Sequence, residues 1–260
     1  MKPTKAQTAR QFDRMSHAYA SSSVHAAGED LAILLEYVRP HAAMRVLDIA
    51  TGAGHTAAAI APSVAQVVAI DIAPSMLART AELAAARGLT NVATELMDVE
   101  AMRFADRSFD VVTCRIAPHH FHDIDKAIRE VARVLCDDGA FVVEDSVVPD
   151  DPALDRFFNE IEAIRDPTHV RSLTVTQWMA KLRAAGLEPV ASTNCPKAHD
   201  VADWIARAGL DAEGAARVYA AFAAAPEPAV ARFALRFEDA RAVSYTDDKV
   251  IIRAEKRPGG

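Results

Sequence analysis

Between residues 45 and 146, short apolar runs rich in valine and isoleucine alternate with longer segments in which apolar residues recur at helical spacing. Continuous apolar runs are typical of strands buried on both faces, and their alternation with helices is typical of a parallel sheet. Five runs are predicted to be strands: Arg45 to Ala50, Val67 to Ile72, Val92 to Met97, Phe109 to Cys114 and Ala140 to Glu144.

The segments between these runs carry helix signals. Pro74 stands at the start and Gly88 just past the end of one apolar-periodic segment, which is the usual placement of these residues around a helix. Residues 124–135 repeat the helical spacing, and Asp138-Gly139 predicts the turn into the fifth strand. The pattern therefore predicts a doubly wound α/β domain.

The flanking segments are predicted to be mostly helical. A helix is expected over residues 29–38, and the pattern after the fifth strand predicts helices at about 152–165 and 174–185, a strand at 187–195, and an alanine-rich helical pair at about 199–224. The stretch from Ala223 to Ala229 is linker-like. Two final strands, Ala242 to Tyr245 and Lys249 to Ala254, are expected around the turn signal Thr246-Asp247-Asp248.

We therefore expect four parts along the chain. Residues 1–40 form a helical lid, and residues 41–198 form a ligand-binding core with covering helices at about 151–185. Residues 199–230 form a helical insertion, and residues 231–260 supply C-terminal strands that complete the sheet.

The composition is that of an ordinary soluble globular protein, with 51% hydrophobic and 25% charged residues in a chain of 260. The net charge of -7 argues against nucleic acid as a partner, because phosphate binding depends on clustered lysine and arginine. Three cysteines without CxxC spacing are typical of a reducing interior. Since neither a signal-like N-terminus nor a stretch of roughly 18 apolar residues is present, we expect a cytoplasmic protein without a membrane partner.

A glycine-containing turn follows the first predicted strand. It reads Asp48-Ile49-Ala50-Thr51-Gly52-Ala53-Gly54-His55 and leads into a helical segment. Strand, glycine turn and helix together let a ligand approach backbone amides at a helix N-terminus. The second strand ends at Asp71, 23 residues after Asp48, where a carboxylate suits two ribose hydroxyls. These features indicate an adenosine-type cofactor without saying which one.

The turn alone does not separate a nicotinamide dinucleotide from S-adenosylmethionine. Its third small residue is Ala57, which some dinucleotide folds tolerate. Asp48 opens the motif from within the strand, and Asp98 follows the third strand, where a carboxylate could meet an adenine amino group. A glycine turn that only closes the fold is the alternative, and the accompanying acids disfavour it.

Four ordered motifs carry a family resemblance over about residues 11 to 195. They are Asp48 to Gly54, Phe109 to Arg115 on the fourth strand, Val134 to Ala140 before the fifth strand, and Gln11 to Tyr19 near the N-terminus. Together they resemble the class I S-adenosylmethionine-dependent methyltransferases of the ubiquinone/menaquinone-type (UbiE-like) branch. Two positions depart from that pattern: Asp138 replaces the first glycine of a pair, and His55 replaces a third glycine.

The resemblance implies a Rossmann-like, seven-stranded, mostly parallel sheet with an antiparallel last strand, and helical insertions after the fifth and sixth strands. It also implies S-adenosyl-L-methionine as the cofactor, with S-adenosyl-L-homocysteine as its product. Gly52 would pass beside the methionine part, Asp71 would accept the ribose hydroxyls, and Asp98 would meet the adenine. The expected cofactor-binding residues are Tyr19, Asp48, Ala50, Gly52, Gly54, Asp71, Ile72, Met76, Asp98, Val99, Cys114 and Arg115. For the Tyr19 side chain, packing against the first helix is the alternative.

Methyl transfer from a sulfonium requires alignment of the reacting atoms and exclusion of water, and it requires a base only where the acceptor loses a proton. The loop after the fourth strand supplies His119 and His120 as candidate catalytic residues, with His122 beside them, because imidazole titrates near neutrality. Their spacing lacks the i, i+4 pattern of helical metal ligands, so no metal is expected. A purely structural loop is the alternative.

A second polar cluster follows the fifth strand. The predicted substrate contacts are Arg165, His169 and Arg171, together with His120, since arginine suits an anionic or carbonyl-bearing molecule. A solvated charged loop is the alternative. Trp178 and Trp204 could wall an aromatic pocket, although their helical spacing favours packing in the core.

These residues predict a methyltransferase acting on a small organic molecule, with O, N and C acceptors left open. One alternative is a non-catalytic protein that binds S-adenosylmethionine or S-adenosylhomocysteine as a subunit or sensor. Another is a nicotinamide-dependent reductase, for which we find no hydride-transfer residues. The expected partner is the methyl acceptor, and the oligomeric state is open, with a homodimer as one option.

Overall fold

The computed structural model describes residues 2–20 and 28–257, without the side chains of residues 16–20. Its strands are β1 (Arg45–Ile49), β2 (Gln66–Asp71), β3 (Val92–Leu96), β4 (Phe109–Arg115), β5 (Leu135–Val148), β6 (Leu173–Thr174), β7 (Leu187–Asp200), β8 (Arg236–Glu238) and β9 (Arg241–Lys256). In the described part of the chain they form one sheet, of which seven strands follow the order β3-β2-β1-β4-β5-β9-β7. The two short strands, β6 and β8, pair with β5 and β9 and were not predicted.

Helices cover both faces of the sheet, which explains why its strands are continuously apolar. On one face, α3 (Glu29–Val38) and α4 (His55–Ile60) share an apolar core with β1 and β2. On the other face, α6 (Ile124–Val134) and α8 (Val175–Ala184) share a core with β4 and β5. Between β2 and β3 the chain forms α5 (Pro74–Ala86), which begins at the predicted proline. The predicted doubly wound α/β fold is confirmed.

Strand register brings the polar strand ends to one edge of the sheet. β1 pairs in parallel with β2 and β4, so that Asp48 lies opposite Ala69 on one side and Thr113 on the other. Open parallel sheets bind ligands at the carboxyl ends of their strands, where Asp71 and Arg115 also lie. β9 runs antiparallel between β5 and β7, as expected for the last strand of this fold.

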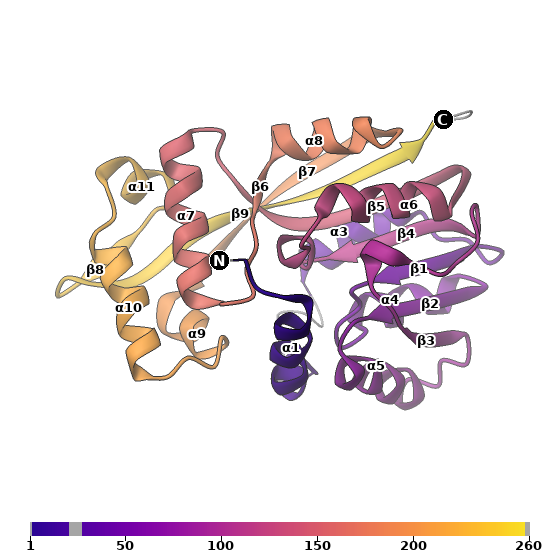
Figure 1. The fold of residues 1–260 in the computed structure, drawn as a ribbon, viewed down its shortest axis with the longest axis horizontal. Helices are drawn as coiled ribbons and strands as arrows, with labels where there is room; N and C mark the ends of the chain where they lie inside the picture. Colours follow the sequence, from indigo (N-terminus) through magenta and orange to yellow (C-terminus); the bar gives the residue numbers. More distant parts are fainter. Residues whose placement is uncertain (1, 21–27, 258–260) are drawn as a thin grey trace.

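A helical lobe lies beside the core of the sheet, at the C-terminal ends of β5 and β7 and the N-terminal end of β9 (Figure 1). It contains α7 (Pro152–Arg165), α9 (Val201–Ala206), α10 (Ala212–Ala223) and α11 (Glu227–Arg232). These helices enclose their own apolar core, which includes Phe158, Trp204, Phe222, Phe233 and Tyr245. Helix α1 (Lys5–Ala20) lies between this lobe and the rest of the sheet and packs against α5 (Figure 1).

The turn predicted at Thr246-Asp247-Asp248 is wrong, because β9 is one continuous strand. The carboxylate of Asp247 is buried and lies 2.9 Å from Nε2 of His199 and 3.1 Å from Nζ of Lys249. Asp248 pairs with Arg232 on α11. Because non-local partners compensate both carboxylates, the two aspartates remain inside a strand that β5 and β7 hold on both sides.

The linker predicted from Ala223 to Ala229 is also wrong. This stretch ends α10 and begins α11, with Pro226 at the N-cap and a second proline in the first turn. Proline is tolerated there because the first amides of a helix have no intrahelical partner. The helical pair predicted at about 199–224 corresponds to α9 and α10, and α11 is a further helix that was not predicted.

The helices of residues 2–20 and 28–257 are too short or too polar to cross a membrane. Crossing a bilayer takes about 20 consecutive apolar residues in a helix. None of the described helices combines the necessary length with the necessary apolar character.

Asp247→Ala should lower the free energy of unfolding by about 3–5 kcal/mol, because it leaves the buried ammonium of Lys249 without its carboxylate. Urea unfolding followed by circular dichroism measures the change. The matched control is Asp137→Ala, which removes an exposed pair with Arg107 and should cost at most about 1 kcal/mol. Equal losses in the two variants would contradict the role of the buried pair.

Candidate functional site

The glycine turn after β1 packs so tightly against α5 that only glycine fits at one position. Gly52 and Gly54 have φ angles of 55° and 82°, in the left-handed region that favours glycine. A Cβ added at Gly54 would lie 2.7 to 2.9 Å from atoms of Thr80. The Thr80 hydroxyl also donates a hydrogen bond of 2.9 Å to the Gly52 carbonyl and so fixes the turn.

Asp71, at the end of β2, connects this turn with the start of α5. Its two carboxylate oxygens accept hydrogen bonds from the amides of Gly52 and Ala73, each at 2.9 Å. Burial raises the pKa of Asp71 to about 6, although both amide hydrogen bonds oppose the shift. A carboxylate has about four acceptor positions, so Asp71 retains acceptor capacity for a ligand.

Asp48 lies beneath the turn and does not line the cavity described next. Its carboxylate is 1% exposed and accepts hydrogen bonds from the hydroxyls of Thr113 at 2.6 Å and Thr51 at 2.5 Å. Burial raises its pKa to about 6, against these two hydrogen bonds. Asp48 therefore shapes the turn from below.

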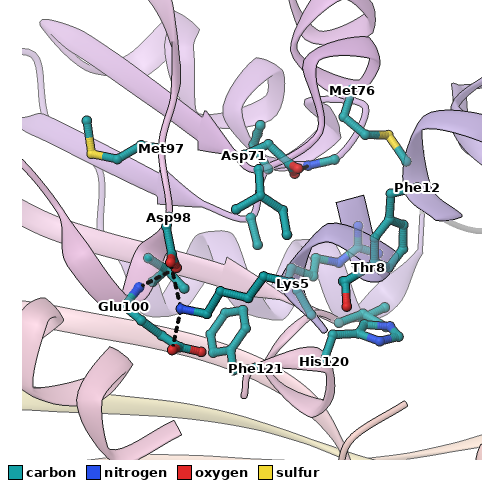
Figure 2. Close-up of a pocket in the computed structure, with 18 of the residues that line it drawn as sticks. Lys5, Thr8, Phe12, Asp71, Met76, Met97, Asp98, Glu100, His120 and Phe121 are labelled. Carbon is teal, nitrogen blue, oxygen red and sulfur yellow. Dashed lines mark hydrogen bonds and ion pairs between the residues drawn. The ribbon is translucent and has the colours of Figure 1, made fainter. Parts of the chain in front are cut away.

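A cavity of about 120 Å³ lies where the turn, the strand ends and α1 meet (Figure 2). Nine predicted site residues line it: Ala50, Gly52, Asp71, Ile72, Met76, Asp98, Val99, Arg115 and His120. Seven other predicted residues are not among its lining: Asp48, Gly54, Cys114, His119, Arg165, His169 and Arg171. Tyr19 belongs to α1, but its side chain lies outside the described residues.

Lys5 of α1 is a site residue that the sequence reasoning missed. Its Nζ lies 2.6 Å from Oδ2 of Asp98 and 2.5 Å from Oε2 of Glu100, and Figure 2 shows its side chain crossing the cavity to reach them. Burial alone would lower the pKa of Lys5, but the two carboxylates raise it. The contact joins residues 93 positions apart, so no local pattern could have indicated it.

Helix α1 and the residue Pro3 before it are held over the cavity by three further contacts. The Asp13 carboxylate accepts hydrogen bonds from the amide and hydroxyl of Ser75, at 3.0 and 2.6 Å. The carbonyl of Pro3 accepts one from Nε2 of His122 at 2.5 Å. The ring of Phe12 meets that of His120 edge to face, with centroids 4.9 Å apart. The cavity consequently has α1 as one of its walls.

Three histidine rings gather beside the cavity. The centroid of His119 lies 4.2 Å from that of His120 and 5.6 Å from that of His169. Each ring has a different anchor: Oδ1 of Asp145 lies 2.5 Å from Nδ1 of His119, the Thr168 carbonyl 3.0 Å from Nδ1 of His120, and Oδ1 of Asn159 2.9 Å from Nε2 of His169. The predicted histidines are therefore brought together from β4–α6 and α7–β6.

These anchors give the three imidazoles different charges. Burial and, next in size, the charge of the neighbouring His119 lower the pKa of His120 to about 4 and that of His169 to about 2. For His119, burial also acts downward, but the Asp145 carboxylate raises its pKa above the ordinary value. Of the three rings, His119 is therefore the one whose protonated form its surroundings favour. Within the described residues, no group of three His, Cys, Asp or Glu side chains is arranged to hold a metal ion.

The predicted arginines are held by carboxylates. Arg115 lies 2.6 Å from Asp30 and 3.0 Å from Glu144, and this buried cluster fastens α3 to the ends of β4 and β5. Arg165 pairs with Glu162 and stacks on the ring of Trp204, which is part of the lobe core as its helical spacing indicated. Cys114 is fully buried, and burial raises the pKa of its thiol.

Arg171, the remaining predicted arginine, lies at the surface. Its guanidinium is 2.6 Å from the carboxylate of Asp155, and the side chain is 42% exposed. Neither Arg171 nor Arg165 lines the cavity beside Asp71. The geometry alone therefore assigns no ligand to these two side chains.

A family model described as Methyltransferase domain matches residues 40–196. The chain is 35% identical over 249 residues to a Bacillus subtilis (strain 168) protein named uncharacterized methyltransferase YcgJ, which covers 95% of this chain and 98% of the relative. The crystal structure of YcgJ matches with a TM-score of 0.84 over 89% of this chain and 99% of that one.

Two further matches cover different shares of the chain. A stretch of 102 residues is 43% identical to a demethylmenaquinone methyltransferase from Thermus thermophilus, over 38% of this chain and 46% of the relative. The structure of the 4+2 cyclase SpnF matches with a TM-score of 0.70 over 99% of this chain and 98% of that one, at 21% identity. At that identity the likeness concerns the fold alone.

Gly54→Ala should destabilise the protein more than Gly52→Ala does. Both substitutions place a side chain in the left-handed region, at a cost of about 1–2 kcal/mol, but only the Gly54 variant meets Thr80 at 2.7 Å. Thermal unfolding of both variants measures the difference. Equal shifts in Tm would show that contact with α5 does not constrain the turn.

Proposed function

Because the chain belongs to the methyltransferase domain family, we propose that it transfers the methyl group of S-adenosylmethionine to a small organic molecule. The convergence of the glycine turn, Asp71 and Asp98 on one cavity carries this proposal. These are the groups that the sequence resemblance assigns to the methionine, ribose and adenine parts of the cofactor. The predicted family, its α/β fold and its cofactor are confirmed at the level of the family.

The residues around the cavity fit the parts of this cofactor. Asp71 has acceptor capacity for two ribose hydroxyls, and Ile72 and Met76 supply apolar surface for a purine. A Cβ built on Gly52 would meet nothing within 4 Å, so the turn leaves open space for a ligand beside its backbone. Asp98 already binds a donor, the Lys5 ammonium, as it would bind an adenine amino group.

When bound, S-adenosylmethionine supplies a methyl group activated by the positive charge on sulfur. The chain then has to orient the acceptor and exclude water. Phe12 and Thr8 of α1 line the cavity and separate it from solvent on that side. Asp48, Gly54 and Cys114 act through the shape of the turn and of β4, since they are not among the lining residues.

The acceptor side of the site remains a proposal. His120 lines the cavity, and His119 and His169 lie beside it, so we assign the acceptor to this cluster. Substrate roles for Arg165 and Arg171, a cytoplasmic location and the oligomeric state stay predictions.

Isothermal calorimetry with S-adenosylmethionine, S-adenosylhomocysteine and NADH in parallel tests which cofactor the cavity binds. We expect binding of the two sulfur nucleosides and none of NADH; NADH binding alone would overturn the proposal. Transfer of tritiated methyl groups to panels of phenols, enols, amines and thiols then tests catalysis. Cofactor binding without transfer to any panel would favour the alternative of a non-catalytic subunit or sensor.

Asp71→Asn should weaken S-adenosylhomocysteine binding by about 1.5–3 kcal/mol, because charge-assisted hydrogen bonds to the ribose become neutral ones. Calorimetry measures the dissociation constant. Glu82→Gln, which removes an exposed charge paired with Arg79 on α5, is the matched control and should bind as the wild type does. An unchanged affinity in Asp71→Asn would remove this carboxylate from the site.

Lys5→Met should strengthen S-adenosylhomocysteine binding two- to fivefold. In the wild type the adenine amino group has to displace the Lys5 ammonium from Asp98, and a partly exposed ion pair of this kind contributes about 0.5–1 kcal/mol. Calorimetry again gives the result. Lys126→Met, at an exposed position of α6, controls for the loss of a positive charge. Weaker binding in Lys5→Met would mean that Lys5 contacts the cofactor directly.

A further inference from the structure

Asp145 and His119 form a buried pair next to the cavity. Asp145 lies on β5, is 1% exposed, and its Oδ1 is 2.5 Å from Nδ1 of His119. Its second oxygen is buried and has no hydrogen-bond partner among the described residues. A buried carboxylate is costly without a positive partner, and among the described residues no other side chain hydrogen-bonds this one, so the geometry favours the protonated form of His119.

His120 has a fixed tautomer with a free acceptor nitrogen. Its Nδ1 lies 3.0 Å from the backbone carbonyl of Thr168, and because a carbonyl only accepts, Nδ1 carries the hydrogen. Nε2 is then the acceptor of the neutral ring, and no hydrogen bond of the described residues occupies it. His120 lines the cavity beside Ala117 and Phe121, which puts its ring within the site.

The charge on His119 acts directly on His120, because the ring centroids are 4.2 Å apart. A second positive charge at that distance is unfavourable, which agrees with the direction in which the pKa of His120 is shifted. The uncharged ring of Phe12 of α1 also contacts His120. The half-buried Asp166, whose carboxylate accepts a hydrogen bond from the Thr168 hydroxyl, acts on His120 in the opposite sense to His119.

Two more distant charges also belong to this environment. Glu162 of α7 acts on His119 in the same sense as Asp145, and it is paired with Arg165. His169 is the third ring and is hydrogen-bonded by the side chain of Asn159. Among the described groups around His120, His119 is therefore the one adjacent ring whose positive charge is favoured by its neighbours.

We propose that Asp145 is a positioning residue for methyl transfer: it holds His119 as a cation, which keeps His120 a neutral acceptor, and the substrate is a molecule whose hydroxyl proton His120 takes. This inference rests on the function proposed above. It selects hydroxyl-bearing acceptors, phenols or enols, because a neutral amine attacks through its lone pair and needs no base in that step.

The proton and electrons balance in this step. The acceptor oxygen, or the carbon conjugated with it, bonds to the methyl carbon, while the carbon–sulfur bond breaks and its electron pair stays on sulfur. The hydroxyl proton moves to Nε2 of His120 and from there to solvent. A hydroxyl proton becomes much more acidic as its molecule is methylated, so even a weakly basic imidazole can take it. The His119 cation disfavours a second charge on His120 and therefore favours release of this proton to solvent.

Nuclear magnetic resonance of protein labelled with ¹⁵N-histidine tests the inference without any acceptor molecule. His120 is assigned from its missing signals in His120→Gln, and its ring nitrogens are followed from pH 8 to pH 4. In the wild type we expect the neutral Nδ1–H tautomer down to about pH 5. In Asp145→Asn and in His119→Gln, loss of the neighbouring cation should raise the titration midpoint of His120 by about one pH unit or more.

The matched control is Asp125→Asn, which removes an exposed carboxylate paired with Lys181 and should leave the His120 titration unchanged. His119→Gln carries the test if Asp145→Asn does not fold. A His120 midpoint unchanged in both variants, or an Nε2–H tautomer in the wild type, would overturn the inference. A merely structural Asp145 would lower stability without moving that midpoint.

The acceptor class has its own test in the tritium assay. Turnover should be confined to the phenol and enol panels and be lost in His120→Ala, while calorimetry shows S-adenosylhomocysteine binding retained. Turnover of amines at the wild-type rate by His120→Ala would contradict the proposed base. Failure of the wild type to bind S-adenosylhomocysteine would instead refute the proposed function, whatever the histidine titrations show.

Discussion

The hydrogen bonds to the buried carboxylate of Asp48 are the interactions on which the proposed cofactor site depends. They tie the turn after β1 to the neighbouring strand β4 through the hydroxyls of Thr51 and Thr113. The turn in turn presents the Gly52 amide to Asp71, and β4 leads into Arg115 and the histidine loop. Burial raises the pKa of Asp48 to about 6, so folding becomes less favourable as the pH rises from about 4 to about 6. The site is thus assembled around a charge that opposes folding at neutral pH.

Local sequence predicts those parts of the fold whose stability is local in origin. β1 to β4, α5 and α6 follow from runs of apolar residues and from Pro74 and Gly88, because burial on a sheet imposes a period that a single segment displays. The glycine turn, Asp71 and Asp98 were found for the same reason, since their chemistry is tied to strand ends. Nine of the predicted site residues line one cavity.

Ion pairs between residues that are far apart in the sequence could not be predicted from such patterns. Asp247 has the sequence of a turn residue, but His199 and Lys249 compensate it within a strand. Lys5 and Asp98, and likewise Asp145 and His119, are pairs whose partners lie on different elements. Whether a charged residue lies in a turn, a strand or a binding site depends on the burial and charge of its neighbours in space. These neighbours are known only once the chain is folded.

The place of β9 in the sheet has a consequence for the order of assembly during synthesis. β9 separates β5 from β7, yet it follows both along the chain, so each has an unpaired edge until residues 241–256 are made. Contacts between segments so far apart in sequence form slowly, and open strand edges can pair with other chains meanwhile. The nascent protein therefore passes through a stage in which β5 and β7, two of its longest strands, each have an edge that could pair with another chain. Insertion of β9 between them covers both edges at once.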